Sequence, residues 1–463
     1  MRYISTRGGV QPIGFAEAVM MGLATDGGLL LPEHLPTIDA KTWQHWAGLS
    51  FQELALAVMT PFIGDAIPTA DLKSLIDRSC RTFSHPEITP VVPVDTRHVL
   101  ELFHGPTLAF KDVALQFLGN LFAYLLDRSG GRLNILGATS GDTGSAAIHG
   151  VRGKERIHIF MIHPHGRVSP TQERQMTTVL DANVHNIAVQ GTFDDGQHIV
   201  KTLFNDLEFK NAYQLGAVNS INWARILAQI VYYVYAWGRV SGGNLNHAVT
   251  FSVPTGNFGD IFAGYVARRM GLPIKRLLLA TNRNDILTRF MATGVYQTGR
   301  VAPTISPSMD IQVSSNFERY LYYLFQGDAE RVRACMEDLA HSGRFQVTAA
   351  EQATAAAELP AVAVDEAATL EQIRSTYTRH NYLLDPHTAV GFRAAQGKSG
   401  TVVCLATAHP AKFAAAVQQA IGHEPDLPPA LAGLAELPSR CAVMPADAGA
   451  VRRFIEESLP PLS

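Results

Sequence analysis

The sequence predicts an α/β protein in which a parallel β-sheet carries helices on both faces. Short apolar runs alternate with longer amphipathic segments between residues 90 and 421. Turns rich in Gly, Ser and Thr follow several of these runs, as expected where a strand passes into a helix. The chain has 463 residues, 47% of them hydrophobic, which favours two or three domains with a large buried core.

The first part of the chain is predicted to be mostly helical. Amphipathic pieces at Phe15–Leu23 and Phe51–Ile63 are separated by a stretch rich in Gly and Pro. Beyond these helices the pattern changes to short β-rich runs, which indicates a boundary. We therefore expect an N-terminal domain at 1–90 and a second region at 91–463, with a smaller α/β subdomain around 135–240 inserted in a larger one.

Five short apolar runs are predicted to form strands of the sheet. They are Asn134–Leu136, His158–Ile162, Thr250–Val253, Leu277–Ala280 and Val402–Ala406. Helical periodicity follows from Ser145 onward, across Ile261–Met270 and up to Ile421. The Ala-rich stretch 349–369 is interpreted as a linker or a helix.

Composition excludes several classes of function. The net charge is −3 and the basic residues are scattered, so we expect no nucleic-acid partner. The four cysteines form no CxxC pair, which predicts a reducing compartment without disulfides or zinc. His163 and His165 have no nearby carboxylate or cysteine cluster, so no metal is expected. No apolar stretch of signal-peptide or membrane-spanning type is present, and we expect a cytoplasmic protein.

Two predicted strand-to-helix turns are suited to anions. The segment LGATSGDTGSAA, 136–147, would expose backbone N–H groups at the positive end of a helix dipole, with hydroxyls beside them. An ordinary helix start capped by Asp142 or Thr143 explains it equally well. The segment VPTGNFGDIFAG, 253–264, brackets Asn257 and Phe258 with glycines that allow close backbone approach to an anion. Two such turns in one chain indicate a pair of anionic ligands.

A third turn, CLATAHPAKF at 404–413, follows the last predicted strand. Thr407 would stand at the end of that strand and offer its hydroxyl to a ligand. Pro410 suits the first turn of the next helix. A simple helix cap accounts for the local pattern equally well.

A single lysine stands at the start of a long apolar segment. Lys111 follows Phe110, and apolar side chains then recur at helical spacing as far as Gly130. At or just before a helix N-terminus, the dipole disfavours a cation, and burial beside Phe110 and Leu108 would do the same. Both effects favour the neutral amine needed for a Schiff base with pyridoxal phosphate. A snorkelling lysine at a helix end is the more common case on physical grounds.

Together these motifs resemble the threonine synthase family, in its longer form with an N-terminal extension domain. The matching segments are GLATDGGLLLP at 22–32, ELFHGPTLAFKD at 101–112, ATSGDTGSAA at 138–147, NSINWARILAQ at 219–229, VPTGNFGDIFAGY at 253–265, LATNRND at 279–285 and TAHPAKF at 407–413. They occur in the family's order and span nearly the whole chain. The segment from about 340 to 370 matches least.

The resemblance implies a fold type II pyridoxal-phosphate enzyme, similar to the tryptophan synthase β-subunit in architecture. That architecture has two parallel-sheet α/β domains plus a helical N-terminal domain, with 91–463 as the cofactor-binding catalytic region. The implied reaction converts O-phospho-L-homoserine and water to L-threonine and phosphate by γ-elimination and β-replacement, the last step of threonine biosynthesis. Either a monomer or a homodimer is expected.

The resemblance also implies roles for particular residues. Lys111 matches the lysine that holds the cofactor and serves as the catalytic base. Residues matching the cofactor site are Gly256, Asn257, Phe258, Gly259 and Asp260 around the phosphate, and Thr407 at the pyridine nitrogen. Residues matching the substrate site are Ser140, Gly141, Asp142 and Thr143, together with Asn219, Ser220, Asn222 and Arg225, which would contribute to phosphate recognition.

Two alternatives differ from this interpretation in chemistry. A related serine or threonine dehydratase would carry out β-elimination on unphosphorylated amino acids. A catalytically inactive threonine-synthase-like protein would keep the fold only as a binding protein. The HGPT-LAFKD segment favours threonine synthase over the first, and the presence of Lys111, Asp142 and Thr407 argues against the second.

Overall fold

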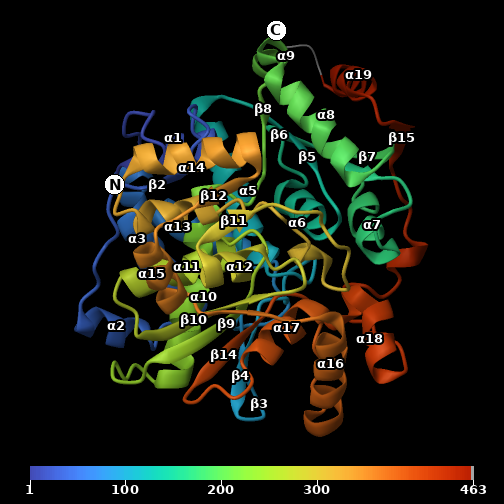
Figure 1. Cartoon of the computed structure of the whole chain (residues 1–463). Helices are drawn as coiled ribbons and strands as arrows, with labels where there is room; N and C mark the ends of the chain where they lie inside the picture. Colours follow the sequence, from blue (N-terminus) through green and yellow to red (C-terminus); the bar gives the residue numbers. More distant parts are fainter. Residues whose placement is uncertain (460–463) are drawn as a thin grey trace. The chain divides into compact units, whose positions relative to one another are not determined.

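The computed structural model describes residues 1–459, and their contacts divide the chain into two compact units (Figure 1). The larger unit comprises Met1–His104 and Ser220–Asp426, and the smaller comprises Gly105–Asn219 with the chain from Leu427 onward. The predicted N-terminal stretch 1–90 therefore lies within the larger unit. Each unit is built around a sheet of its own.

The larger unit contains a six-stranded sheet. Its strands in spatial order are β13 (Ala361–Ala363), β10 (Ile274–Thr281), β9 (Val249–Pro254), β14 (Val402–Ala406), β4 (Arg97–Glu101) and β3 (Val91–Val94). All neighbouring pairs are parallel except β3 with β4, which is antiparallel. In the register, Cys404 of β14 lies opposite Ser252 of β9 and Val99 of β4. The predicted parallel sheet is confirmed, and three of the five predicted strands belong to it.

Helices cover both faces of this sheet. One face packs against α16 (Glu366–His380), α17 (Pro386–Ala394) and α18 (Ala414–Ile421). Leu278 and Ala280 of β10 belong to that core, whereas Leu277 approaches Gly264 of α11 (Gly259–Arg269). Because side chains alternate along a strand, α11 and its neighbour α10 (Trp223–Ser241) lie on the opposite face.

The N-terminal part of the larger unit is mostly helical. Its elements are β1 (Tyr3–Ser5), α1 (Phe15–Met21), β2 (Leu30–Pro32), α2 (Ala40–Trp46), α3 (Phe51–Ile63) and α4 (Thr69–Cys80). Strands β1 and β2 pair antiparallel, and α3 packs against both α4 and α10. Helix α3 begins where the sequence predicts, because Ser50 and Glu53 form a capping box there.

The segment between β10 and β14 contains smaller elements. They are α12 (Ile286–Thr293), β11 (Val295–Gln297), α13 (Phe317–Leu324), α14 (Ala329–Ser342), β12 (Arg344–Gln346) and α15 (Ala349–Glu358), with β11 and β12 paired antiparallel. The Ala-rich stretch 349–369 is not a linker: it forms α15, the edge strand β13 and the start of α16. Strand β13 escaped prediction because alanines give no alternating pattern.

The smaller unit contains a five-stranded parallel sheet. Its strands in spatial order are β15 (Ala442–Pro445), β7 (Val184–Gln190), β6 (Ile157–Pro164), β5 (Leu133–Ala138) and β8 (Leu215–Gly216). Strands β5 and β6 were predicted. Strand β15 comes from the C-terminal part of the chain, which the sequence did not place here.

Helices also flank the smaller sheet. One face packs against α8 (Phe193–Asn205), α9 (Leu207–Ala212) and α19 (Ala448–Ser458), with Phe160 and Ile162 of β6 in that core. The remaining helices are α5 (Lys111–Ser129), α6 (Asp142–Val151) and α7 (Pro170–Thr177). Asn186 of β7 points toward α7, where its amide donates to Met176 O.

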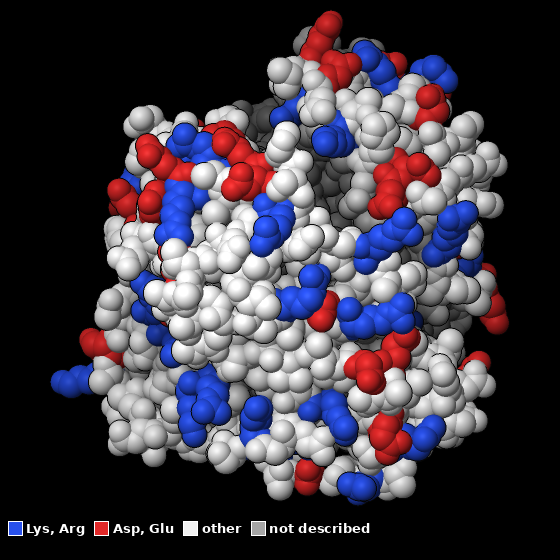
Figure 2. Space-filling view, viewed as in Figure 1, with Lys and Arg blue, Asp and Glu red and all other residues white. Residues whose placement is uncertain are grey.

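Within residues 1–459, no helix is long and apolar enough to cross a membrane. No group of three or more His, Cys, Asp or Glu residues there could hold a metal ion, and the four cysteines are unpaired. Figure 2 shows basic and acidic side chains interspersed over the face in view, in keeping with the scattered charges of the sequence.

A half-buried histidine pair predicts how stability depends on pH. The His158 and His185 rings stack, with His158 Nδ1 3.2 Å from His185 Nε2. Burial, with His158 and Arg440 nearby, lowers the pKa of His185 from 6.5 to about 4. In the unfolded chain His185 is therefore protonated as the pH falls below 6.5, whereas in the folded chain it stays neutral until about pH 4.

The free energy of unfolding should accordingly fall by about 1 kcal/mol between pH 7 and pH 5, since partial exposure of the ring reduces the effect. His185→Phe, which keeps an aromatic ring against Phe160, should flatten that dependence in denaturant titrations. His198→Gln, an exposed change on α8, is the control and should leave it intact. An unaltered pH slope in His185→Phe would contradict the assignment.

Candidate active site

In the smaller unit, Lys111 is the first residue of α5. Its side chain is 10% exposed, and Nζ lies 4.7 Å from the centre of the Phe110 ring. Nζ is also 3.6 Å from Asp142 Oδ2, so the structure brings together two residues that the sequence predicted separately. A buried amine at a helix N-terminus is thus held beside the start of the next helix, α6.

The turn before Lys111 is held by Asp112. The Asp112 carboxylate accepts from Thr107 N at 2.8 Å and from Thr107 Oγ1 at 2.7 Å. Gly105 is required in this turn because a Cβ there would lie 2.4 Å from Asp112 Cβ. Gln175 of α7 donates to Thr107 O at 3.1 Å. Asp112 and Gln175 therefore fix the start of α5, a role that the sequence analysis missed.

Thr139 and Gln172 fix the predicted substrate loop, residues 140–143. Thr139 Oγ1 accepts from Gly141 N at 3.0 Å and Gly144 N at 2.9 Å, and Gln172 Nε2 donates to Asp142 Oδ1 at 2.8 Å. The N-cap of α6 is Gly141, with φ 143°, so the expected cap by Asp142 or Thr143 is wrong. Only glycine suits that φ, and Asp142 is instead bound by neighbouring side chains.

Ser140 and Thr143 remain accessible in this loop. Ser140 is exposed and Thr143 is half-buried, while Gly141 and Asp142 between them are buried. The first-turn N–H groups of α6 have no acceptors within the helix, as at any helix start. The loop can therefore present hydroxyl and backbone donors to an anion.

In the larger unit, a phosphate loop, defined as residues 255–260, joins β9 to α11. Phe258 has φ +63° and turns the chain into the helix, which begins at Gly259. A Cβ on Gly256 would lie 2.7 Å from Ser308 O, so the backbone approaches its neighbour more closely than any other residue allows. The loop leads directly into the N-terminus of α11, and a helix N-terminus favours anions.

Asp260 stands in the first turn of α11 and points toward α10. Tyr232 OH donates to Asp260 Oδ1 at 2.5 Å, and Tyr233 OH donates to the same oxygen at 3.0 Å. Burial, followed by the Asp260 charge, raises the pKa of both tyrosines well above 10, so both hydroxyls remain donors. Through these contacts the Asp260 side chain holds the phosphate loop against α10. The sequence analysis had predicted Asp260 as a cofactor-binding residue.

The clamp segment, residues 304–316, binds the carbonyl groups of the phosphate loop. Ser314 Oγ donates to Gly256 O at 2.7 Å, while Asn316 N and Nδ2 donate to Asn257 O at 3.1 and 3.0 Å. In a trans peptide the following N–H points away from the carbonyl. The N–H groups of Asn257 and Phe258 are therefore directed away from the clamp segment, as an anion site requires.

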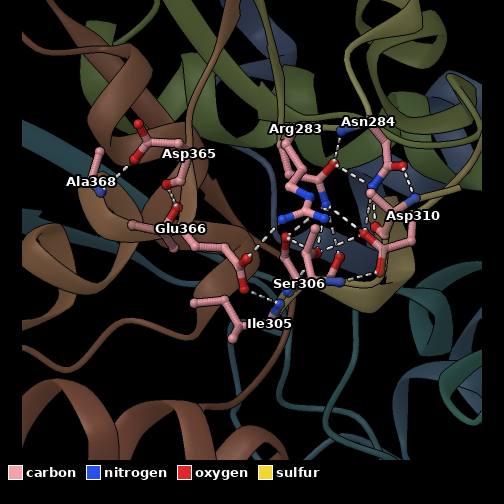
Figure 3. A network of polar contacts seen from close by, with 12 residues as sticks. Arg283, Asn284, Ile305, Ser306, Asp310, Asp365, Glu366 and Ala368 are labelled. Atoms are coloured by element: carbon pink, nitrogen blue, oxygen red, sulfur yellow. Dashed lines mark hydrogen bonds and ion pairs between the residues drawn. The ribbon is translucent and has the colours of Figure 1, made fainter.

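The clamp segment is itself anchored beyond the end of β10 (Figure 3). Asp310 Oδ1 accepts from Asn282 Nδ2 at 2.8 Å, from Asn284 Nδ2 at 2.9 Å and from the Thr304 hydroxyl. Glu366 of α16 accepts from Ile305 N at 3.2 Å. The two asparagines of the LATNRND motif thus hold the clamp segment through Asp310, a role that the sequence analysis did not assign.

Arg319 of α13 joins three segments through one guanidinium group. It is fully buried, and its Nε and Nη2 donate to Leu30 O of β2 at 3.0 and 2.7 Å. Nη2 also donates to Ile221 O, and Nη1 donates to Asn316 Oδ1. Burial lowers the pKa of Arg319 to about 9, which still leaves the group charged at pH 7.

Thr407 follows β14 and is buried. Its N–H donates to Thr388 Oγ1 at 3.2 Å, and Thr388 Oγ1 donates to Asp385. Asp385 also accepts from His387 Nδ1, and His387 Nε2 accepts from Ser308 N at 3.1 Å. One carboxylate at the start of α17 therefore fixes both the backbone of Thr407 and the clamp segment.

The predicted substrate residues near α10 have different surroundings. Ser220 Oγ lies 2.8 Å from Ser315 Oγ of the clamp segment, whereas Asn219 is the last residue of the first segment of the smaller unit. Asn222 caps α10 by accepting from Ala224 N, and its amide donates to Val19 O at 2.8 Å. Both ends of the Asn222 side chain are thus used structurally, which favours a supporting role.

Arg225 is buried in α10 with unmet hydrogen-bonding capacity. It is 3% exposed, and among the described residues its Nε and Nη1 have no hydrogen-bond partner. Burial lowers the pKa of Arg225 to about 10. A buried, incompletely bonded cation is costly in free energy, so its presence indicates an anion as its ligand.

The residues of the larger unit fit a cofactor phosphate. Gly256 permits close backbone approach, the clamp segment binds the carbonyls, and α11 supplies the positive end of its dipole. Asp260, the acid nearest this helix start, is held by two tyrosine hydroxyls. The donors of this loop are uncharged backbone N–H groups at a helix N-terminus.

Comparisons with known proteins agree along the whole chain. Family profiles described as "Threonine synthase N terminus", "Pyridoxal-phosphate dependent enzyme" and "Threonine synthase, C-terminal" match residues 2–80, 88–361 and 388–455. Threonine synthase of Pseudomonas aeruginosa is 48% identical, with 99% of this chain and 98% of the relative covered. That of Saccharomyces cerevisiae is 47% identical at the same coverage. The crystal structure of threonine synthase from Brucella melitensis with bound pyridoxal phosphate superposes with a TM-score of 0.96, at 48% identity and 99% coverage of both chains.

Replacing Arg319 tests how much stability depends on its hydrogen bonds. Arg319→Met should lower the free energy of unfolding by about 3 kcal/mol, because buried carbonyl groups of Leu30 and Ile221 lose their donors. Arg239→Met is the control: Arg239, near the end of α10, donates to Ala47 O and Leu49 O, and its replacement should cost about 1 kcal/mol or less. Equal losses in denaturant titrations would contradict the role given to Arg319.

Proposed function

We propose that this chain, which belongs to the threonine synthase family of pyridoxal-phosphate-dependent enzymes, converts O-phospho-L-homoserine and water to L-threonine and phosphate. The observation that carries the proposal is the buried Lys111 at the start of α5, in ion-pair contact with Asp142 of the substrate loop. A lysine at that point suits a reaction that needs an amine both to hold a carbonyl cofactor and to move protons.

The cofactor residues divide the binding task between them. In the proposal, the phosphate loop binds the cofactor phosphate with N–H groups that the clamp segment directs away from itself. Lys111 Nζ would hold the cofactor through its aldehyde, and the Thr407 hydroxyl would serve the pyridine nitrogen. When bound, pyridoxal phosphate supplies an electron sink that stabilises negative charge at the substrate's carbon atoms.

Substrate recognition requires sites for a carboxylate and for a phosphate. We assign the carboxylate to the substrate loop, where Ser140 and Thr143 add hydroxyl donors to those of the helix start. We assign the phosphate to Arg225, whose buried Nε and Nη1 have bonding capacity to spare, with Ser220 beside the phosphate loop as a further contact. Asn219 and Asn222 remain predicted residues of the substrate-phosphate site. Asn222 would act indirectly, by holding the turn before α10 in place.

Lys111 is the proposed proton carrier of the reaction. Its amine would take the proton from the α-carbon of the substrate and give it up to the bound cofactor, which makes the amine a base again. It would then remove a proton from the β-carbon before phosphate leaves the γ-carbon, and a proton would return to the γ-carbon before water adds at the β-carbon. Asp142, 3.6 Å from Nζ, would orient the amine between these positions. Thr107 and Asp112 hold the helix start from which the lysine projects, so the amine keeps its place through several transfers.

The proposal includes a cytoplasmic location and a monomer or homodimer. The four unpaired cysteines among the described residues support a reducing compartment.

Replacing Lys111 tests the proposed chemistry. Lys111→Ala should reduce threonine formation from O-phospho-L-homoserine at least about 10³-fold and remove the cofactor absorbance that depends on a lysine, because no other group moves protons at that point. Threonine and phosphate are measured together. Lys154→Ala, a lysine of the same unit that donates to Asn120, is the control and should keep full activity.

The wild-type products separate the proposal from its alternatives. Equal amounts of threonine and phosphate are expected. Phosphate with 2-oxobutyrate would mean that water does not reach the β-carbon. Activity only on unphosphorylated serine or threonine would indicate a dehydratase. A bound cofactor without turnover of any of these amino acids would indicate an inactive relative.

Arg225 can be tested independently of the proton transfers. Arg225→Gln should raise KM for O-phospho-L-homoserine about tenfold or more, since a charge-assisted hydrogen bond is lost. The same change should leave the melting temperature equal or higher, because it removes a buried cation with unmet bonds. Arg239→Gln, near the end of the same helix, should leave KM unchanged. A lowered melting temperature with normal KM would show that Arg225 is structural.

A further inference from the structure

Asn316 contacts both a cofactor loop and a substrate turn. Its Nδ2 donates to Asn257 O of the phosphate loop at 3.0 Å and to Ser220 O at 3.1 Å. We infer that Asn316 is a positioning residue that holds the phosphate loop and the turn at Ser220 in one fixed arrangement, so that cofactor and substrate affinity depend on the same side chain. The inference rests on the function proposed above.

The orientation of the Asn316 amide is determined by its partners. Arg319 Nη1 donates to Asn316 Oδ1, which leaves Nδ2 as the only donor end of the amide. Both of its hydrogens then meet carbonyl oxygens. The residue is fully buried, so water cannot replace any of these bonds. A rotated amide would place two oxygens together in the interior, which is strongly unfavourable.

A second connection runs parallel to the first. Ser315 Oγ lies 2.8 Å from Ser220 Oγ and donates to Asn257 Oδ1 at 3.4 Å. Asn316 N adds a bond to Asn257 O at 3.1 Å. Neighbouring residues of the clamp segment therefore join the two loops, and Asn316 contributes the buried part of this connection.

Arg319 extends the same connection to the N-terminal part of the chain. It binds Leu30 O of β2, Ile221 O beside Ser220, and Asn316. The N-terminal extension thereby helps to set the orientation of Asn316, which in turn holds Asn257. This gives the extension a positioning role in cofactor binding in addition to its part in the core.

The diagnostic substitution is Asn316→Asp. A carboxylate keeps the size of the amide and the bond from Arg319, but it cannot donate to Asn257 O or Ser220 O. The two loops should then separate while α13 remains bound. We expect the Kd for pyridoxal phosphate, measured by removing the cofactor from the purified chain and titrating it back, to rise about tenfold or more. KM for O-phospho-L-homoserine at saturating cofactor should rise as well.

The matched control is Asn183→Asp in the smaller unit. Asn183 is also buried, its Nδ2 donates to Val151 O and Ile157 O at 2.9 and 2.7 Å, and its Oδ1 accepts from Gly153 N. The same chemical change there should lower the melting temperature and leave both constants at wild-type values. If Asn316→Asp does not fold, Asn316→Ser, which keeps the main-chain bond to Asn257, replaces it.

The outcomes separate the inference from a general loss of stability. A rise in both Kd and KM for the Asn316 variant alone supports it. Wild-type constants in that variant, an equal rise in Asn183→Asp, or a rise in Kd with unchanged KM would each overturn it. The cofactor titration does not depend on turnover, so a failure of the proposed reaction would be seen separately, as wild-type chain that binds the cofactor and makes no threonine.

Discussion

The buried guanidinium group of Arg319 is the constraint on which the candidate site of the larger unit depends. A charge taken out of water must be surrounded by acceptors, and Arg319 obtains them from β2, from the turn before α10 and from the clamp segment. Each acceptor belongs to a different part of the chain, so satisfying one side chain places all three. The phosphate loop follows, because Asn316 and Ser314 bind its carbonyls.

The smaller unit obtains the same precision without a buried arginine. Its two candidate-site turns are held by short side chains that bind backbone N–H groups: Asp112 accepts from Thr107 N, and Thr139 accepts from Gly141 N and Gly144 N. Glycine is needed where these side chains fold back onto the backbone, as at Gly144, where a Cβ would lie 2.3 Å from Thr139 Cγ2. Asp112 and Thr139 are close in sequence to the groups that they bind, so this part of the support is local. Gln172 and Gln175 of α7 each add one bond from farther along the chain.

The two candidate anion sites offer mainly neutral donors. Both candidate loops end in a helix N-terminus, and the carboxylates nearest to them, Asp142 and Asp260, are bound by side-chain donors. Arg225 is the exception, a buried cation with atoms left to bond. This arrangement suits the proposed reaction, which binds phosphate and carboxylate groups and then releases phosphate, because hydrogen bonds from neutral donors are weaker than charge-assisted ones.

The sequence by itself determined the features whose cause is local. Helix α3 begins at a capping box, β14 is an unbroken apolar run, and α5 begins at Lys111, because spacing and capping act over a few residues. Glycine-rich turns and a lysine at a helix start were visible for the same reason. Only the tertiary structure decided which side chains support them. Asn316 and Asn257 are 59 residues apart and Arg319 and Leu30 are 289 apart, and no periodicity records a hydrogen bond across such distances. The cap formed by Gly141, the structural use of Asn222 and the return of β15 to the smaller sheet depend on the same kind of contact between distant segments, which forms only when the whole chain has folded.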